Sequence, residues 1–362
     1  MTLGLFGVGQ AFEDEKENQA AEAVRRYDGK VTRDLTSLNL EGTKVTDAGL
    51  KELAPLKQLT TINLGFTKVS DIGLKELAPL KQLHSLNLDF TQVTDAGLKE
   101  LAELKQLHSL SLDQTQVTDA GLKEIAPLKQ LTTIRLRFTK VSDIGLKELA
   151  SLTKLTDIDL SGTKVTDAGM KEIGQFKELI SLGLGDTKVT DEGLKELAHL
   201  TGLTRLVLYK TAVTGTGLKE LAQLTKLEFL TVAGVPVTDL DLKELAPFKE
   251  LTTLHLQNTQ VTDMGLKELA PLKKLVTLHL DQTQVTDAGL KELASLKELK
   301  CLCLVGTRLT DIGLKELVGL KSLQELDLSS TKVTDSGVVD LRKALPKCKI
   351  TRYVAPPISN SQ

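Results

Sequence analysis

The sequence contains little of what usually builds or braces a large core. Among its 362 residues it has no tryptophan, three cysteines and only 3% aromatic residues. The core must therefore consist mainly of leucine, isoleucine, valine and alanine, which suit thin, stacked layers. Cys301, Cys303 and Cys348 are too few and too clustered to hold so long a chain together through disulfides.

An excess of one charge and a long apolar run are also lacking. The chain has 46 Lys and Arg against 48 Asp and Glu, a net charge of −2. Proteins that bind nucleic acid or anionic membranes by charge carry a basic excess. No apolar run approaches the roughly 18 residues of a membrane-spanning helix. We therefore predict no nucleic-acid partner and no membrane span.

The N-terminal segment, residues 1–12, is apolar and precedes the charged sequence EDEKE. Small residues at its end resemble an export signal, but the basic beginning of such a signal is missing. The segment is either the remnant of a signal peptide or a disordered N-terminus. The second interpretation is favoured, and with it a cytoplasmic rather than an exported protein.

A glycine within the sequence TDAGLKEL recurs every 24 residues. A fixed period of about 20 to 29 residues that carries L-x-x-L-x-L is the signature of leucine-rich repeats. In one repeat Asp241 occupies the place of the glycine. The glycines of this series are Gly49, Gly73, Gly97, Gly121, Gly145, Gly169, Gly193, Gly217, Gly265, Gly289, Gly313 and Gly337.

The first half of each repeat has the pattern of a strand. In the repeat that begins at Leu59, the apolar residues Ile62 and Leu64 are expected to point inward. Thr61 and Asn63 alternate with them, so they should point outward, as the two-residue period of a strand requires. The varying outward positions should therefore form one face of a sheet.

The second half of each repeat has the pattern of a short helix. Leu50 and Leu53 show helical spacing, and Asp47 stands where an N-cap residue is expected. Gly49 should allow close packing against the neighbouring repeat. Proline near the end of many of these segments, as at Pro55, should keep the helices short.

The repeats occupy most of the chain. Thirteen strand segments can be counted from residues 35–40 to residues 323–328, and a degenerate fourteenth surrounds Ile350. Because terminal repeats must be capped, we expect an N-terminal capping helix in residues 13–34, repeats in residues 35–346, and a C-terminal cap and tail in residues 347–362. The predicted fold is an α/β solenoid, a leucine-rich-repeat horseshoe with a concave parallel β-sheet and short convex helices.

The repeat motif T-x-V-T-D-x-G-L-K-E-L-A resembles the cysteine-containing class of leucine-rich repeats in F-box substrate receptors, with threonine, as at Thr67, in place of the cysteine. It is still more similar to bacterial, planctomycete-like leucine-rich-repeat proteins, over about residues 31–350. The F-box relatives imply a substrate receptor of a ubiquitin-ligase-type system, but the roughly 34 residues before the first strand leave no room for an F-box. The bacterial relatives imply an interaction module.

Departures from the repeat point to a binding surface. Residues 59–73 and 131–145 are identical except that Arg135 and Arg137 replace an asparagine and a glycine, both at outward positions. Divergence on this face indicates partner binding, with neutral drift as the alternative. Arginine and aromatic residues are enriched at interface hot spots. The predicted partner-binding patch consists of Arg135, Arg137, Asp157, Asp159, Arg205, Tyr209, Lys210 and Phe229.

A smaller row of aromatic residues occupies one repeat position. Phe66, Phe90 and Phe138 follow their strands directly. We favour core packing beneath the turn for these rings over a second binding surface.

A possible metal site lies further along the chain. His255, His279 and Cys303 share one outward position in successive repeats, and Cys301 precedes Cys303 by two residues. These residue types are ligands of zinc. A flat sheet hinders tetrahedral closure, however, and no supporting carboxylate is evident. Reduced thiols beside solvated imidazoles are therefore favoured, and no metal or other cofactor is predicted.

A second histidine column, His84 and His108, lies near serines and aspartates, which suggests a hydrolase. Strand alternation turns each histidine and the following serine to different sides, and an open sheet offers no water-excluding pocket. The nearby residues are Ser85, Ser109, Asp89 and Asp113.

We therefore predict a non-enzymatic scaffold that binds a protein or peptide on its concave face. A rigid structural or surface spacer protein is the alternative. The sequence specifies no oligomeric state.

Overall fold

The computed structural model describes residue 15 and residues 18–353. Residues 1–12, expected to be either a signal-peptide remnant or a disordered N-terminus, and the end of the predicted tail lie outside the described residues. The described chain forms two compact units, which meet in sequence between Leu179 and Ile180.

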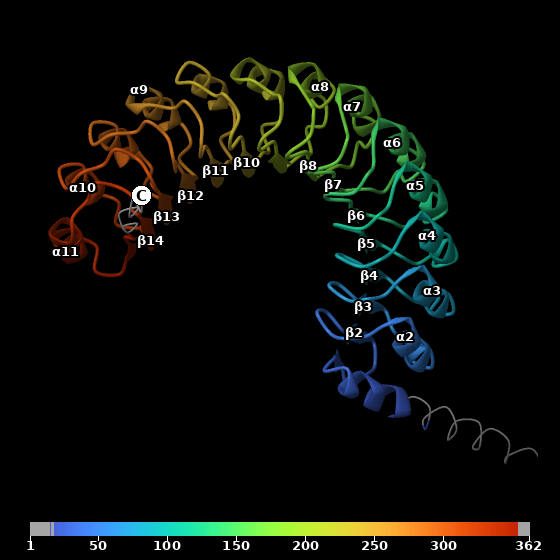
Figure 1. Cartoon of the computed structure of the whole chain (residues 1–362). Coiled ribbons are helices and arrows are strands. Elements are labelled where there is room, and N and C mark those ends of the chain that lie inside the picture. Colours follow the sequence, from blue (N-terminus) through green and yellow to red (C-terminus); the bar gives the residue numbers. More distant parts are fainter. Residues whose placement is uncertain (1–14, 16–17, 354–362) are drawn as a thin grey trace, which may run out of the picture. The chain divides into compact units, whose positions relative to one another are not determined.

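Unit 1 begins with a helix over residues 18–26 and continues as alternating short strands and helices (Figure 1). Its strands are β1 Lys30–Val31, β2 Ser37–Asn39, β3 Thr61–Asn63, β4 Ser85–Asn87, β5 Ser109–Ser111, β6 Thr133–Arg135 and β7 Asp157–Asp159. Its further helices are α2 Asp47–Leu53, α3 Asp71–Leu74 with the 3₁₀ helix η1 Lys75–Leu77, α4 Asp95–Leu101, α5 Asp119–Ile125, α6 Asp143–Leu149 and α7 Asp167–Ile173.

Unit 2 repeats the same alternation. Its strands are β8 Ser181–Gly183, β9 Arg205–Val207, β10 Phe229–Thr231, β11 Thr253–His255, β12 Thr277–His279, β13 Cys301–Cys303, β14 Glu325–Asp327 and β15 Lys349–Thr351. Its helices are α8 Asp191–Lys195, η2 Gly215–Leu221, η3 Leu242–Leu245, α9 Asp263–Leu266 with η4 Lys267–Leu269, η5 Leu290–Ser295, α10 Leu314–Leu317 and α11 Asp335–Ala344.

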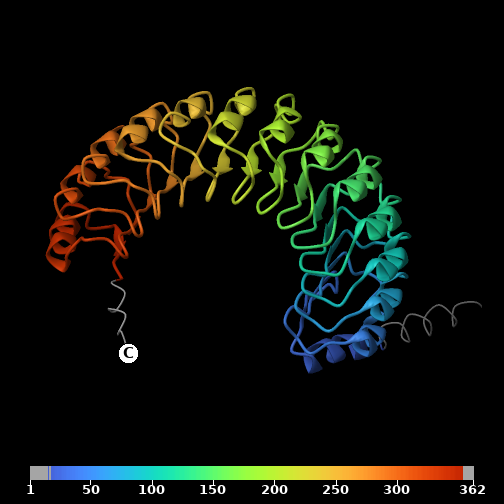
Figure 2. The same ribbon diagram turned by 45° about the horizontal axis from the view of Figure 1, so that its top comes forward.

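The strands of each unit follow one another in chain order and pair in parallel, one repeat against the next. Within each unit the helices lie on the side opposite the open face of the sheet (Figure 2). The predicted leucine-rich-repeat solenoid with short helices is thereby confirmed. The strand Lys30–Val31 departs from the expectation of a purely parallel sheet, because it pairs antiparallel with β2. None of the helices in the described residues has the length and apolar composition needed to cross a bilayer.

The core lies between sheet and helices and is made of aliphatic layers. The central residue of each three-residue strand is buried, as Ile62 is in β3, and it pairs in register with its counterpart, Leu86, in the next repeat. The threonine that follows the strand is buried in most repeats: the Thr67 hydroxyl donates to the carbonyl of Leu64 at 2.7 Å. The bond satisfies a backbone carbonyl at the end of the strand, so the threonine has a structural role.

In most repeats an aspartate at or shortly before the start of the helix joins two repeats. Asp47 is the first helical residue and Thr46 is the N-cap residue, so the prediction of Asp47 as the N-cap was wrong. The Asp47 carboxylate instead accepts hydrogen bonds from the backbone N–H and the hydroxyl of Ser70 in the next repeat, at 2.8 and 2.6 Å. It keeps its favourable place near the positive end of the helix.

The recurring glycine makes room for this carboxylate. A Cβ atom on Gly73 would lie 2.4 Å from Oδ1 of Asp47. The expectation that the glycine permits close packing between repeats is thus confirmed, and its neighbour is the aspartate of the preceding repeat.

The irregular repeat exchanges these two residue types. Gly215 stands where the aspartate belongs, and Asp241, one repeat later, stands where the glycine belongs. The Asp241 carboxylate accepts hydrogen bonds from the backbone N–H and the hydroxyl of Thr238 at 2.8 and 2.7 Å. A Cβ atom on Gly215 would lie 1.9 Å from Cγ of Asp241. The same space therefore holds one carboxylate, supplied from the opposite side.

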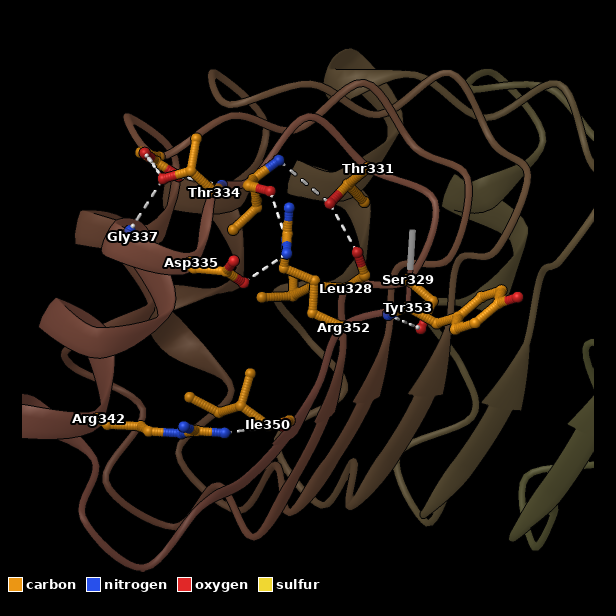
Figure 3. A network of polar contacts seen from close by, with 12 residues as sticks. Leu328, Ser329, Thr331, Thr334, Asp335, Gly337, Arg342, Ile350, Arg352 and Tyr353 are labelled. Atoms are coloured by element: carbon orange, nitrogen blue, oxygen red, sulfur yellow. Dashed lines mark hydrogen bonds and ion pairs between the residues drawn. The ribbon is translucent and has the colours of Figure 1, made fainter. Parts of the chain in front are cut away.

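Strand β15 closes unit 2. It pairs in parallel with β14, which confirms the fourteenth strand segment expected around Ile350. Arg352 donates from Nε to the carbonyl of Val333 at 2.6 Å and forms an ion pair with Asp335 (Figure 3). Arg342 donates to the carbonyl of Ile350 at 3.3 Å. These contacts therefore hold strand β15 against unit 2, beyond the last complete repeat.

Candidate functional site

The residues on either side of each buried strand centre lie on the open face of the sheet. The structure divides the predicted patch between the two units. Arg135, Arg137, Asp157 and Asp159 belong to unit 1, whereas Arg205, Tyr209, Lys210 and Phe229 belong to unit 2. They form two clusters.

In unit 1 an arginine is held between two aspartates. The backbone N–H of Arg137 donates to Oδ1 of Asp113 at 2.7 Å. Its Nε lies 3.8 Å from Oδ2 of Asp113 and 3.9 Å from Oδ2 of Asp159. Arg135 is exposed beside Asp159, its partner in register on β7. Arg137 is thus occupied within the chain, while Arg135 is accessible.

Asp113 is the member of this cluster that sequence analysis missed. Its pKa is raised to about 6, mainly by burial and also by the Asp89 and Asp159 carboxylates, against the opposing hydrogen bond and charge of Arg137. Its place in the same repeat column as Arg137 could have revealed the contact.

In unit 2 a cation lies over an aromatic ring. The guanidinium carbon of Arg205 is 3.7 Å from the ring centroid of Phe229, within the range of a cation–π interaction. The other neighbour of Phe229 is His255, whose ring meets it edge-on at a centroid distance of 5.1 Å. The three side chains come from the successive strands β9, β10 and β11.

A hollow of about 590 Å³ lies beside this group on the open face. It exists because β10 is followed by the small residues Ala233 and Gly234, whereas both neighbouring repeats carry larger side chains there. The Tyr209 ring packs over the backbone of Gly185, where a Cβ atom would lie 2.1 Å from the ring. The hollow is lined by Arg205, Val207, Tyr209, Lys210, Phe229, Thr231, Ala233, Gly234, His255, Gln257 and Asn258.

One polar atom at the hollow is unsatisfied. The side-chain Oε1 of Gln257 is buried and accepts no hydrogen bond among the described residues. Because a buried acceptor without a donor costs about 1–3 kcal/mol, an incoming N–H would be stabilised here.

His255 contributes no positive charge at neutral pH. Its pKa is lowered to about 4, mainly by burial and also by the neighbouring His279 and Arg205, against the opposing charge of Asp281. The charge at the hollow therefore comes from Arg205 and the exposed Lys210. His255 was expected in the candidate metal row, and its contact with Phe229 was not predicted from the sequence.

The disfavoured candidate metal site, the row His255, His279, Cys301 and Cys303, is brought together in part. Ligand atoms of His279, Cys301 and Cys303 all lie within 4.8 Å of one another. His255 packs against the ring of His279, at a centroid distance of 4.3 Å. The expectation that no carboxylate supports the row was wrong, because Oδ2 of Asp281 lies 3.6 Å from Nδ1 of His279.

The three cysteines are free. Burial is the main cause that raises the pKa of Cys303 to about 12, and it also raises the pKa of Cys301. Without a bound cation, both are therefore neutral thiols at physiological pH.

The aromatic row does not pack in the core, and the favoured interpretation was wrong. Phe66, Phe90 and Phe138 are 54%, 46% and 39% exposed. Their φ angles of 57°, 54° and 54° lie in the left-handed region and direct them out of the turn. Phe66 and Phe90 stack on each other at a centroid distance of 4.2 Å.

The rings of His84 and His108 also stack, at 5.2 Å. Nδ1 of His108 faces the carbonyl oxygen of Gln106. The ring is therefore engaged by its own chain rather than by a serine.

Comparison with known proteins agrees with this architecture. A family model described as leucine-rich repeat matches residues 33–54, 82–102, 151–174, 250–270, 272–294 and 319–341. Among curated proteins, none matches the sequence significantly. The chain therefore contains leucine-rich repeats by an independent criterion.

Two bacterial structures are similar over most of the chain. An internalin (InlF) from Listeria monocytogenes is 26% identical with a TM-score of 0.66, over 89% of this chain and 86% of that one. A leucine-rich-repeat protein of Leptospira interrogans is 27% identical with a TM-score of 0.60, over 83% and 80%. The resemblances to planctomycete proteins and to F-box receptors stay predictions.

Proposed function

We propose that the chain is a non-enzymatic scaffold that binds a protein partner on the open face of unit 2, at the hollow beside Arg205 and Phe229. Leucine-rich-repeat proteins generally act as protein-binding scaffolds. The hollow is the observation that carries the proposal, because it joins an aromatic anchor, two cations and an unsatisfied acceptor in one place.

These groups favour a particular kind of partner segment. The walls formed by Phe229 and Tyr209 suit an apolar side chain, whereas Arg205 and Lys210 suit a neighbouring carboxylate. Oε1 of Gln257 suits a backbone or side-chain N–H. We therefore propose a peptide or protein loop that places an apolar and an acidic residue side by side.

The unit 1 cluster is proposed as a secondary contact. Arg135 is its accessible cation, while Arg137 is already paired with Asp113 and Asp159. The substitution of Arg135 should therefore weaken binding less than that of Arg205.

The test begins with affinity capture from cells of the source organism on the full chain. Binding of the captured protein is then measured with purified components by isothermal titration calorimetry. Phe229→Ala and Arg205→Ala should each weaken it by at least about 30-fold, the effect of removing a hot-spot side chain. Arg308→Ala removes an exposed arginine of unit 2 outside the hollow and is the matched control.

Unchanged affinity in Phe229→Ala and Arg205→Ala would refute the proposed surface. If no protein is captured above the level of an unrelated bait, the rigid spacer becomes the better interpretation. Circular dichroism of each variant keeps loss of folding apart from loss of binding.

A further inference from the structure

The row formed by His279, Cys301 and Cys303 brings three metal-ligating groups to one point of the open face of unit 2. Cys301 and Cys303 flank the buried Leu302 on β13, so both side chains project from the same face. His279 is the register partner of Cys303 on β12. Their ligand atoms lie within 4.8 Å of one another.

This spacing is close to that of a shared metal ion. Zinc binds sulfur at about 2.3 Å and imidazole nitrogen at about 2.0–2.1 Å in a tetrahedral arrangement. Two ligands of one ion are then roughly 3.3–3.8 Å apart. The side chains must approach by only about 1 Å, which small changes in their χ angles allow. A metal ion bound by these three ligands needs no fourth residue from the sheet. The flatness of the sheet therefore does not prevent binding.

The residues around these three ligands favour the binding of a cation by the imidazole of His279. Asp281 lies beside Nδ1 of His279 at 3.6 Å, which leaves Nε2 of the ring for a metal. A carboxylate behind a ligating histidine fixes its tautomer and orientation. Oε2 of Glu325 lies 4.0 Å from Sγ of Cys301, and Asp327 is the register partner of Cys303. Three carboxylates thus surround the sulfur atoms and stabilise positive charge.

We propose that His279, Cys301 and Cys303 bind a zinc-class divalent metal ion, with Asp281 orienting the histidine and water in the fourth position. Two sulfurs and one imidazole form a donor set that suits zinc, whereas magnesium and calcium require oxygen ligands. Binding displaces the two thiol protons, which pass to solvent. His255 stays outside the coordination sphere because it lies on β11, beyond His279.

The experiment uses the full chain, stripped of metal and kept reduced under nitrogen. Cobalt(II) is added first, because two thiolates in a tetrahedral site give an intense thiolate-to-cobalt absorption band and visible d–d bands. Zinc is then added, and its affinity is measured by competition with a chromophoric chelator. Cys301→Ser and Cys303→Ser remove a ligand, and Cys348→Ser is the matched control because its thiol is outside the cluster.

One cobalt ion per chain is expected for the wild type and for Cys348→Ser, with complete displacement by zinc. The thiolate-to-cobalt band should be halved or lost in Cys301→Ser and Cys303→Ser, whose folding is checked by circular dichroism. Asp281→Asn should retain the band and bind zinc about 10–100-fold more weakly, the usual effect of removing a supporting carboxylate.

Absence of the band in the folded wild type overturns the proposal. Equal zinc affinity in the wild type and in both serine variants also overturns it. The partner measurements above are made with chelator present, so failure of the metal site and failure of the binding surface are distinguished.

Discussion

The exchange between Gly215 and Asp241 offers a quantitative test of how the repeats are joined. Asp241→Gly removes the acceptor of two hydrogen bonds from Thr238. Hydrogen bonds to a charged group are worth about 1.5–3 kcal/mol each. Thr238 is only half-buried, so water replaces part of the loss. We expect a decrease of about 2 kcal/mol in the free energy of unfolding.

Gly215→Asp introduces a second carboxylate into an occupied space. Its Cβ atom would lie 1.9 Å from Cγ of Asp241, so the Asp241 side chain must be displaced and two negative charges are brought together. We expect a decrease of about 3 kcal/mol or more, the upper range for overpacking. The double variant Gly215→Asp/Asp241→Gly restores the arrangement of the other repeats, in which the earlier repeat supplies the carboxylate and the later one the glycine.

Urea unfolding of the full chain, followed by circular dichroism, gives the three free-energy changes. Independent effects would sum to about 5 kcal/mol. We expect the double variant to lie within about 2 kcal/mol of the wild type, a coupling of about 3 kcal/mol. A double variant destabilised by the full sum would refute the explanation of the glycine as space for the neighbouring carboxylate.

Three further predictions concern single side chains. The pKa of Asp113 is raised to about 6, mainly by burial, so the folded state binds more protons than the unfolded state between about pH 4 and 6. The free energy of unfolding should therefore fall by up to about 3 kcal/mol as pH rises through this window. The fall should disappear in Asp113→Asn. The pH dependence due to His255 is opposite, because its pKa is lowered to about 4. The free energy of unfolding should therefore fall as pH decreases from 6.5 towards 4. In His255→Gln the midpoint of urea unfolding should change less over this pH range. Thr115→Val removes a buried hydroxyl that donates to the carbonyl of Leu112 at 2.7 Å, and it should lower the free energy of unfolding in urea by about 1 kcal/mol; an unchanged free energy of unfolding would contradict a structural role for the threonine column.

The sequence predicted the fold well because periodicity determines it. The spacing of Ile62 and Leu64 located a strand, and the same residues are buried in register with the next repeat. The predicted N-cap residue, Asp47, differs by one position from the observed N-cap residue, Thr46. Sequence spacing alone could not show that its carboxylate bonds forward to Ser70 rather than to its own helix.

The candidate site was predicted less completely, because its contacts depend on side-chain size and direction across strands. The outward positions of Arg205 and Phe229 followed from alternation, but their stacking did not. The hollow depends on the small residues Ala233 and Gly234 beside larger neighbours. The exposure of Phe66 follows from a positive φ angle after the strand, which leucine periodicity does not reveal.

The contact between the aspartate of one repeat and the glycine of the next also determines how repeats can be added to such an array. Each ordinary repeat presents a carboxylate to the next repeat and a glycine to the previous one, so any regular repeat fits behind any other. A gene segment that encodes 24 residues can therefore be copied or deleted without spoiling either junction, and the near-identity of residues 59–73 and 131–145 is what such copying leaves behind. At Gly215 and Asp241 the two halves of this contact are reversed. These two repeats must be inherited together, because either one next to an ordinary repeat would create a clash or an empty space.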